Sequence, residues 1–250
     1  MPYVERVTKA GKTIEVERYY TSRYNKPGIT RGSKVKATQE AQKKVNTRKA
    51  ERTLRLILAE NYQDGDLHID FGYIRKQGEP YRTREEMRKD ADVFLRELRK
   101  AYKKQDRELK YVHVMEIGEK GARHHHLVIN HIDTRLIQAA WKKAYQANSK
   151  IHFHPLDTNG DYSRLAAYLI KYTDKTVGTD EGLQGKRWNC SRNLRRPEPV
   201  YRIIKDRNQF SAEPKPKKGY YIDKDSIEVG THSPEFYGYG YLHYRMVRIE

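Results

Sequence analysis

The stretch that decides the fold runs His124-His125-His126-Leu127-Val128-Ile129-Asn130. Its apolar half predicts a buried β-strand, in which successive side chains point to opposite faces of the sheet. His124 and His126 then share one face, whereas His125 points to the other face with Leu127 and Ile129. The two outer imidazoles can therefore reach one metal ion.

The preceding apolar stretch, Tyr111–Ile117, predicts a second strand that a short, glycine-bounded turn joins to the first. If this turn is centred near Lys120, Glu116 lies opposite His124, with cross-strand Cβ atoms about 5 Å apart. Two imidazoles and one carboxylate then converge and leave coordination positions open. An open site of this kind suits a catalytic divalent ion better than a structural one.

Two alternatives weigh against this metal site. A His-x-His pair alone is a weak indication, because two such residues are more often accidental surface residues. The stretch His152-Phe153-His154 has the same spacing, but Pro155 ends that strand at once and no carboxylate precedes it across a short turn. Glu116 and the apolar half of its own strand favour the His124–His126 pair.

The remaining patterns predict an α+β fold, in which helices cover an antiparallel sheet. Thr83 and Glu86 form a capping box that begins one of the helices. Strands are predicted near residues 14–18, 67–74 and 150–154, and helices over 38–62, 83–102, 134–147 and 162–175. Residues 176–199 look irregular and basic, and the tail has no assigned elements. The predicted segments are a basic N-terminal extension and helix (1–62), a catalytic domain (63–199) and a Tyr-rich extension of unassigned role (200–250).

The charge balance indicates a polyanionic partner. The 250 residues carry 51 Lys and Arg against 33 Asp and Glu, a formal net charge of +18. Nucleic acid is the first candidate, because each neutralised phosphate releases counterions. An acidic membrane surface is the rival, although no apolar run approaches the roughly 20 residues that span a bilayer. Cys190 is the only cysteine, which excludes intrachain disulfides and fits a cytoplasmic location; no signal segment opens the chain.

Aromatic and basic side chains fit single-stranded nucleic acid without proving it. The chain has 20 tyrosines beside 5 phenylalanines and 2 tryptophans, and tyrosine can stack on bases and still form hydrogen bonds. A polar protein with tyrosines in its core would have the same composition. The helix over residues 38–62 carries a basic face that includes Lys44 and Arg48. Such a face is either solvated or in contact with a DNA backbone.

The predicted helix over residues 162–175 places Leu165, Tyr168, Leu169 and Tyr172 on one face, and Lys171 is the surface neighbour of Tyr168. One interpretation is that the tyrosines pack against the sheet. The other is that a phenol acts as nucleophile on a phosphodiester, because an aryl phosphate stores the bond energy for a later reversal. A free phenol has a pKa of about 10 and needs a metal ion or a lysine to react at neutral pH.

The combination of Glu116, the histidine strand, and Tyr168-Leu169-Ile170-Lys171-Tyr172 resembles the rolling-circle replication initiators of the HUH endonuclease superfamily. Replication-associated proteins of phages and bacterial mobile elements are the most similar group. They also tend to carry a segment similar to residues 186–194, Lys-Arg-Trp-Asn-Cys-Ser-Arg-Asn-Leu, and one similar to residues 44–46, Lys-Val-Asn. The resemblance covers about residues 38–199. It departs from the family at His125, where a hydrophobic residue is usual, but alternation still favours the two outer histidines as ligands.

The resemblance implies a five-stranded antiparallel sheet and a metal site for Mg²⁺ or Mn²⁺ formed by His124, His126 and Glu116. It also implies Tyr168 as nucleophile with Lys171 beside it. Tyr172 either serves a second strand transfer or belongs to the apolar stripe. The implied partner is single-stranded DNA at an origin, with a host helicase and polymerase as further candidates. The residues expected to contact nucleic acid are Arg123, Lys186, Arg187, Trp188, Arg192, Lys44 and Arg48.

Two other functions remain open at this point. A relaxase or a single-strand transposase would use the same chemistry in another biological role. A non-catalytic nucleic-acid-binding protein would keep the histidines for structural reasons and would bind DNA without forming a covalent adduct.

Overall fold

The chain divides into two compact units in the computed structural model. One unit comprises residues 1–45 and 196–250, and the other comprises residues 46–195. The residues that the structure describes are 3–21, 38–118, 121–146, 149–157, 160–174, 186–205, 213–231 and 240–249.

The unit of residues 46–195 is built on a five-stranded antiparallel sheet with the strand order β6-β3-β5-β4-β7. Its strands are β3 (Leu67–Gly72), β4 (Tyr111–Ile117), β5 (Arg123–Ile129), β6 (Ile151–Pro155) and β7 (Asn189–Cys190). Its helices are α2 (Arg84–Lys103), α3 (Thr134–Ala144), α4 (Ser163–Asp174) and most of α1 (Gln39–Asn61). This arrangement confirms the predicted α+β fold and the five-stranded antiparallel sheet.

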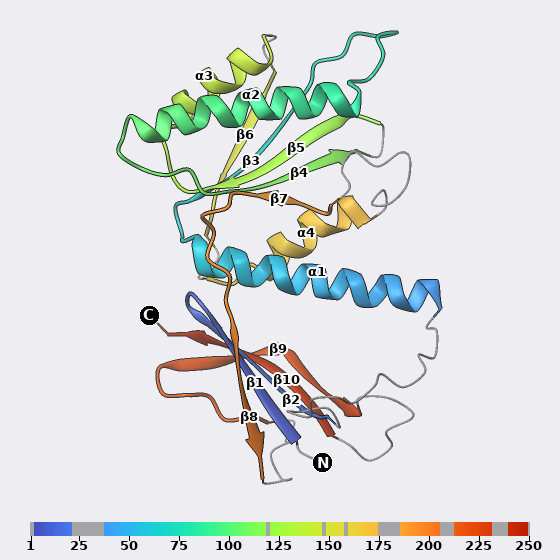
Figure 1. Ribbon diagram of the computed structural model, residues 1–250, viewed down its shortest axis with the longest axis vertical. Helices are drawn as coiled ribbons and strands as arrows, with labels where there is room; N and C mark the ends of the chain where they lie inside the picture. Colours follow the sequence, from blue (N-terminus) through green and yellow to red (C-terminus); the bar gives the residue numbers. More distant parts are fainter. Residues whose placement is uncertain are drawn as a thin grey trace, which may run out of the picture. The chain divides into compact units, whose positions relative to one another are not determined.

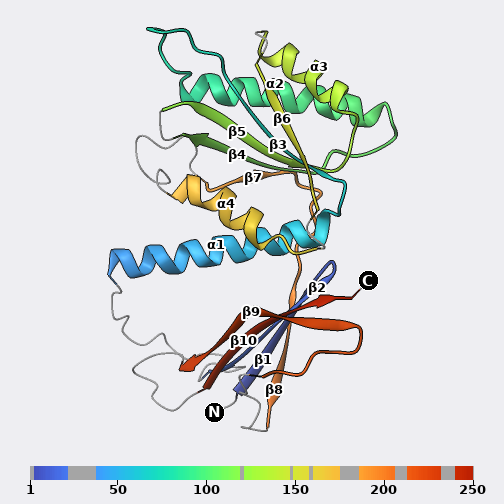
Figure 2. The same cartoon turned by 180° about the vertical axis from the view of Figure 1, so that it is seen from behind.

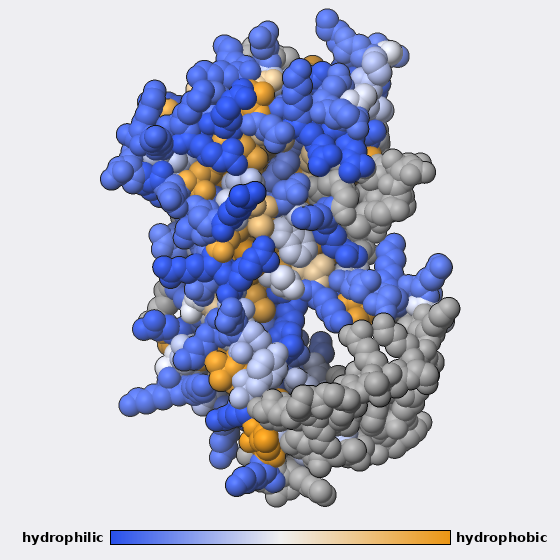
Figure 3. Space-filling model, viewed as in Figure 1, coloured by the Kyte–Doolittle hydropathy of each residue, from blue (hydrophilic) through white to orange (hydrophobic). Residues whose placement is uncertain are grey.

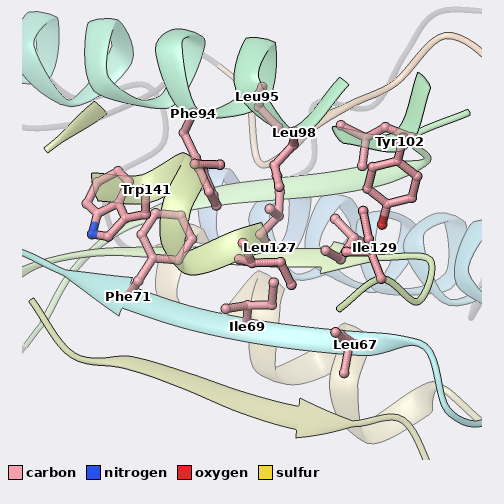
Figure 4. Packing of buried hydrophobic residues seen from close by; sticks show 14 residues of the cluster. Leu67, Ile69, Phe71, Phe94, Leu95, Leu98, Tyr102, Leu127, Ile129 and Trp141 are labelled. Carbon is pink, nitrogen blue, oxygen red and sulfur yellow. The ribbon is translucent and has the colours of Figure 1, made fainter. Parts of the chain in front are cut away.

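One face of this sheet is apolar and carries the hydrophobic core. Ile69 and Phe71 of β3 and Leu127 of β5 are 0–1% exposed, and they pack beneath Phe94 of α2 and Trp141 of α3. Figure 4 shows these side chains filling the space between α2 and the sheet. Helices α2 and α3 both lie on this face (Figure 1), whereas α1 and α4 lie on the opposite side of the sheet in both views (Figures 1 and 2). The hydrophobic cluster that contains Phe94 and Trp141 therefore lies on the side of the sheet that α2 and α3 cover.

Local sequence signals placed several elements correctly. β4 has the predicted bounds of Tyr111–Ile117. At the start of α2, the Thr83 side chain accepts a hydrogen bond from the Glu86 amide at 3.2 Å, and the Glu86 carboxylate accepts one from the Thr83 amide at 2.8 Å. Before α4, the Asp161 carboxylate accepts a hydrogen bond from the Ser163 amide at 3.0 Å. Such caps satisfy backbone amides that have no partner inside the helix.

The stretch predicted to be irregular, residues 176–199, contributes the edge strand β7. This strand has only two residues and pairs with β4 through His113–Asn189 and Val112–Cys190. A two-residue strand is too short to show a period of two, so the sequence pattern gave no sign of it. Residues 175–185, which precede it, lie outside the described residues.

The other unit contains a second five-stranded antiparallel sheet, which the sequence analysis did not anticipate. Its order is β8-β1-β2-β10-β9, formed by β1 (Tyr3–Ala10), β2 (Thr13–Tyr20), β8 (Pro199–Ile204), β9 (Tyr220–Thr231) and β10 (Gly240–Arg248). The segments predicted as separate N-terminal and C-terminal extensions thus supply strands to one sheet. Val16 and Leu242 are among the buried residues of its core.

Charged side chains are unusually well buried in this second sheet. Glu5 is 2% exposed and accepts a hydrogen bond from Arg18 at 2.7 Å, and its other carboxylate oxygen lies 2.5 Å from the guanidinium of Arg202. Burial alone would raise the pKa of Glu5, but the two guanidiniums outweigh burial and hold it below its usual range.

Across the described parts of the chain, no helix is long and apolar enough to cross a membrane.

Candidate active site

The second face of the β6-β3-β5-β4-β7 sheet is rich in titratable side chains. Strand register places Asp70 of β3 beside His126 of β5 on one side and His152 of β6 on the other. Because side chains alternate along each strand, the residues at every second position share this face. The polar face defined in this way carries His68, His124, His126, His152, His154, Asp70 and Glu116.

The predicted register between Glu116 and His124 is confirmed, because the two residues are directly paired across β4 and β5. The Glu116 carboxylate contacts the diagonal neighbour instead, and it forms a hydrogen bond with Nε2 of His126. His126 is 4% exposed and Glu116 is 6% exposed. A carboxylate and an imidazole nitrogen thus meet in a buried place at one end of the sheet.

His124 lies at the margin of this pair, between two glycines. A Cβ atom on Gly72 would stand 3.0 Å from Nδ1 of His124, and one on Gly118 would stand 3.6 Å from its Cδ2. A side chain at Gly72 would therefore compete for the space that the His124 ring occupies. The absence of a side chain at Gly72 therefore makes room for this imidazole.

The donor types on this face fit a divalent metal ion, although they are not already gathered around one. His126 and Glu116 bring a nitrogen and an oxygen donor into contact, and His124 lies one residue pair away on the same face. Within the described ranges, no group of three or more His, Cys, Asp and Glu side chains has an arrangement that could hold a metal ion. Ligation by all three predicted residues would therefore require a side chain to rotate.

His68 is a component of this face that the sequence analysis missed. Its ring stacks between those of His126 and His154, with centroid distances of 5.6 and 5.4 Å. It is 9% exposed, and no described residue offers its Nε2 atom a hydrogen bond. Burial, followed by the proximity of His126 and His154, lowers the pKa of His68 to about 3. The ring is therefore neutral at physiological pH and has a nitrogen lone pair available.

The histidine pair of β6, which the sequence analysis ranked second, also lies on the polar face. Nε2 of His154 is 2.7 Å from the Asp70 carboxylate. The sequence analysis found no carboxylate across a short turn from this pair. Asp70 belongs to β3, which is distant from β6 in the sequence and pairs with it in the sheet. The alternation of His68 and Asp70 in the predicted strand of residues 67–74 was the available signal.

Tyr168 projects from α4 toward the polar face. The helix buries Ala166, Leu169 and Ile170, whereas Tyr168 is 39% exposed. Its ring meets that of His126 edge-on, with a centroid distance of 5.4 Å, and it lies 6.0 Å from that of His68. Tyr168 is therefore not a buried core residue, which was the alternative interpretation of the helical pattern.

The two other predicted residues of α4 are placed less completely. Lys171 is exposed and lies three residues after Tyr168 on the same helix. The backbone of Tyr172 belongs to α4, but its side chain lies outside the described residues. The sequence stripe that joined Leu165, Tyr168, Leu169 and Tyr172 therefore corresponds only partly to the face that α4 buries.

His125 lies on the apolar face, as alternation predicts. It is fully buried, and its ring stacks on that of Phe71 at 5.0 Å. Its nitrogens form hydrogen bonds with Nε2 of His113 at 2.9 Å and with the hydroxyl of Tyr73 at 2.7 Å. Burial and the neighbouring histidines hold its pKa well below the ordinary value. This polar contact on both sides explains how a histidine replaces a hydrophobic residue inside the core.

The residues predicted to contact nucleic acid are mostly on the surface. Lys44 and Arg48 are exposed on α1, where Lys44 also forms an ion pair with Glu40 at 2.8 Å. Arg192 is exposed and lines a pocket of about 800 Å³ together with Arg99. In Figure 3 the surface over α2 and α3 is largely hydrophilic.

Residues 186–188 and Arg123 complete this group. Lys186 is exposed, and Arg187 and Trp188 are half-buried. The Arg187 guanidinium donates a hydrogen bond to the Thr47 hydroxyl at 3.4 Å, which connects this segment to α1. Arg123 begins β5 and stands immediately before the first histidine of the polar face.

Comparison with known proteins gives one similarity. Residues 79–177 match the family described as Replication-associated protein ORF2/G2P, which is less than half of the chain. The matched range contains Glu116, His124, His126, Tyr168 and Lys171. The match supports a role in the initiation of replication. Neither the curated proteins nor the solved structures gave a match.

Proposed function

We propose that this chain is a rolling-circle replication initiator of the HUH type, which nicks and rejoins single-stranded DNA through a 5′-phosphotyrosine intermediate. The observation that carries the proposal is the position of Tyr168. Its ring lies 5.4 Å from that of His126, which forms a hydrogen bond with Glu116. The match to a replication-associated family supports the proposal, because the matched residues include all three side chains.

In the proposed reaction, the phenol oxygen of Tyr168 attacks a backbone phosphorus atom. The new oxygen–phosphorus bond forms as the bond to the 3′-oxygen breaks; the phenol releases its proton and the departing 3′-oxygen takes one up. The protein keeps the 5′-phosphate, and the free 3′-hydroxyl can prime synthesis by a host polymerase, with a helicase to separate the strands. A phenol of ordinary pKa, about 10, is protonated at neutral pH, so the attack needs assistance.

Residues of the polar face and of α4 would supply this assistance. His126, Glu116 and His124 would hold Mg²⁺ or Mn²⁺, which acts as a Lewis acid on the phosphate when it is bound. Lys171, exposed on the same helix, would neutralise charge that builds up on the phosphate. The 39% exposure of Tyr168 leaves its ring accessible to a DNA strand.

The test uses end-labelled single strands tiled over the replicon that carries the coding sequence, incubated with Mn²⁺ and resolved on a denaturing gel. A 3′-labelled strand should move with the protein, and a 5′-labelled strand should shorten without retaining protein. EDTA should abolish both changes, and mass spectrometry of the digested adduct should place the nucleotide on Tyr168. Binding of these strands without any adduct would instead identify a non-catalytic nucleic-acid-binding protein.

A further inference from the structure

A pocket of about 530 Å³ opens at the end of the sheet where β3 stops and β5 begins. It lies entirely within the unit of residues 46–195. Its lining draws on the segment after β3, the residues before α2, the residue after α3 and the first residue of β5. The side chains that matter here are Tyr73, Tyr81, Tyr145, Arg75, Arg82 and Arg123.

Arginine and tyrosine side chains are stacked on one another along this pocket. The guanidinium of Arg75 lies 4.2 Å from the centre of the Tyr81 ring, and that of Arg123 lies 5.2 Å from the same ring. The guanidinium of Arg82 lies 5.5 Å from the rings of both Tyr73 and Tyr145. Planar cations and aromatic rings of this kind are the surfaces on which unpaired bases stack.

Two of the three arginines have no acidic partner among the residues that the structure describes. Arg75 donates a hydrogen bond to the carbonyl oxygen of Glu79 at 2.8 Å. Arg123 donates to the carbonyl oxygens of Gly121 at 3.2 Å and of Arg82 at 3.5 Å. These contacts orient the two guanidiniums through carbonyl oxygens. By contrast, Arg82 forms ion pairs with Glu86 and Asp90.

The turn between β4 and β5 is fitted to Tyr81. Gly121 has a φ of +78°, and a Cβ atom on it would stand 3.0 Å from the Tyr81 ring. Both the backbone conformation and the space therefore require glycine at this position. Tyr81 rests on the same turn that leads through Arg123 to His124, so the pocket lies at the end of the sheet where His124 stands. Because side chains alternate along β5, Arg123 lies on the face of His125, and His124 lies on the polar face.

We infer that this pocket binds one unpaired nucleotide of the single strand, at the end of the sheet where β5 begins. The base continues the stack of Tyr81 with Arg75 and Arg123, and these two guanidiniums face the adjoining phosphates. The inference rests on the proposed function, because it takes single-stranded DNA as the substrate. It adds a subsite, lined by Tyr81 and Arg123, that is separate from the predicted metal ligands and from Tyr168.

The first experiment measures the affinity of the full chain for a fluorescein-labelled, mixed-sequence single strand by anisotropy at fixed salt. Tyr81→Ala should weaken binding roughly 5- to 150-fold, because stacking on one aromatic ring is worth about 1–3 kcal/mol per base. Tyr81→Phe keeps the ring and should bind as the wild type does. Tyr221→Ala removes another exposed tyrosine, from β9 of the other unit, and should also bind as the wild type does.

The second experiment locates the base directly. A strand that carries 5-iododeoxyuridine at successive positions is irradiated with the protein, and the cross-linked peptides are identified by mass spectrometry. At one position the cross-link should fall on Tyr81, Tyr145 or Tyr73. Unchanged affinity of Tyr81→Ala together with cross-links only outside the pocket would overturn the inference.

These outcomes are separate from those of the nicking assay. A wild-type protein that forms the adduct, while Tyr81→Ala binds normally and cross-links fall only outside the pocket, would refute the pocket and leave the nicking activity standing. A protein that forms no adduct but loses affinity in Tyr81→Ala would do the reverse. Titration with dAMP covers a free nucleotide as the ligand: tight binding of dAMP with no binding of the strand would also overturn the inference.

Discussion

Tyr168 differs from the buried tyrosines of its unit because it is 39% exposed and still lies against two imidazoles. We expect Tyr168→Phe to abolish the covalent protein–DNA adduct, since it removes the attacking oxygen and keeps the ring contacts. Affinity for the oligonucleotide should stay near that of the wild type in anisotropy titrations. Tyr172→Phe, one turn further along α4, is the matched variant and should still form the adduct of first cleavage. Loss of adduct in Tyr172→Phe alone would reassign the nucleophile.

The three consecutive histidines should separate into two classes by metal affinity. His124→Ala and His126→Ala each remove a side chain from the polar face, and calorimetry should show weaker Mn²⁺ binding and loss of cleavage. His125→Leu removes a side chain from the apolar face and should keep both. Lost metal binding in His125→Leu, with binding kept in His124→Ala, would require a different ligand set.

A hydrophobic residue is usual at position 125 in the family that the sequence resembles, so leucine there would be expected to raise stability on a buried face. The structure reverses this expectation, because the substitution leaves Nε2 of His113 and the hydroxyl of Tyr73 without this partner. An unsatisfied buried polar group costs about 1–3 kcal/mol. The free energy of unfolding of His125→Leu should therefore fall, which urea denaturation can measure.

At the scale of elements, the fit between β3 and β5 depends on a glycine. A Cβ atom on Gly72 would stand 2.9 Å from the carbonyl oxygen of Arg123, and this backbone atom cannot move aside easily. We expect Gly72→Ala to destabilise the protein by about 1–3 kcal/mol, as overpacking does, and to weaken Mn²⁺ binding through displacement of His124. Alanine would otherwise be favoured over glycine in a strand.

Gly118→Ala provides the matched control, because Gly118 directly follows β4 and lies on the other side of His124. A Cβ atom there would meet the Ala122 carbonyl oxygen at 3.5 Å and the His124 ring at 3.6 Å, which are ordinary contact distances. Its melting temperature and metal affinity should stay close to those of the wild type. Equal effects of the two substitutions would mean that the space around His124 is not what sets its position.

The elements that sequence reasoning placed well are those that local patterns specify. Alternation and a short turn were enough to put Glu116 opposite His124, and a capping box was enough to begin α2. His68 was not recognised and His154 was ranked second, because their rings meet only when β3 lies between β5 and β6, and the pairing of distant strands is not specified locally. The sequence left open whether Tyr168 packs against the sheet, and the structure shows that its helix buries Ala166 and Ile170 while Tyr168 is 39% exposed.

At the scale of the whole molecule, the net charge of +18 predicts strongly salt-dependent binding of DNA. The logarithm of affinity for single strands should fall linearly with the logarithm of salt concentration, with a slope near −0.7 for each phosphate contacted. Anisotropy titrations at several KCl concentrations give this slope. A flat response would contradict the electrostatic interpretation of the basic surface.

Stability should depend on pH because the core holds neutral histidines. Burial, then the proximity of His126, lowers the pKa of His113 to about 4, whereas the unfolded chain has the ordinary value of about 6.5. The unfolded state therefore binds more protons between these values, and the free energy of unfolding should decrease as pH falls below about 6.5. The decrease attributable to His113 is about 3 kcal/mol by pH 4.

Urea unfolding followed by tryptophan fluorescence can check this dependence, since Trp141 packs in the same core. His113→Gln keeps a hydrogen-bonding group and does not titrate, so its stability should change less between pH 6.5 and 5. A wild-type protein equally stable at these two pH values would show that the buried rings do not control acid unfolding.

The sheet that joins both ends of the chain has a consequence for biosynthesis. β1 and β2 leave the ribosome as a hairpin, but their neighbours β8 and β10 follow only after residues 21–198 have been made. At about 5–20 residues per second, this delay lasts about 10 to 40 s. During that time both hairpin edges are open to pairing with other nascent chains, and the unit of residues 46–195 can form first. The yield of folded protein should therefore depend on translation speed, because slower synthesis leaves the hairpin edges open for longer.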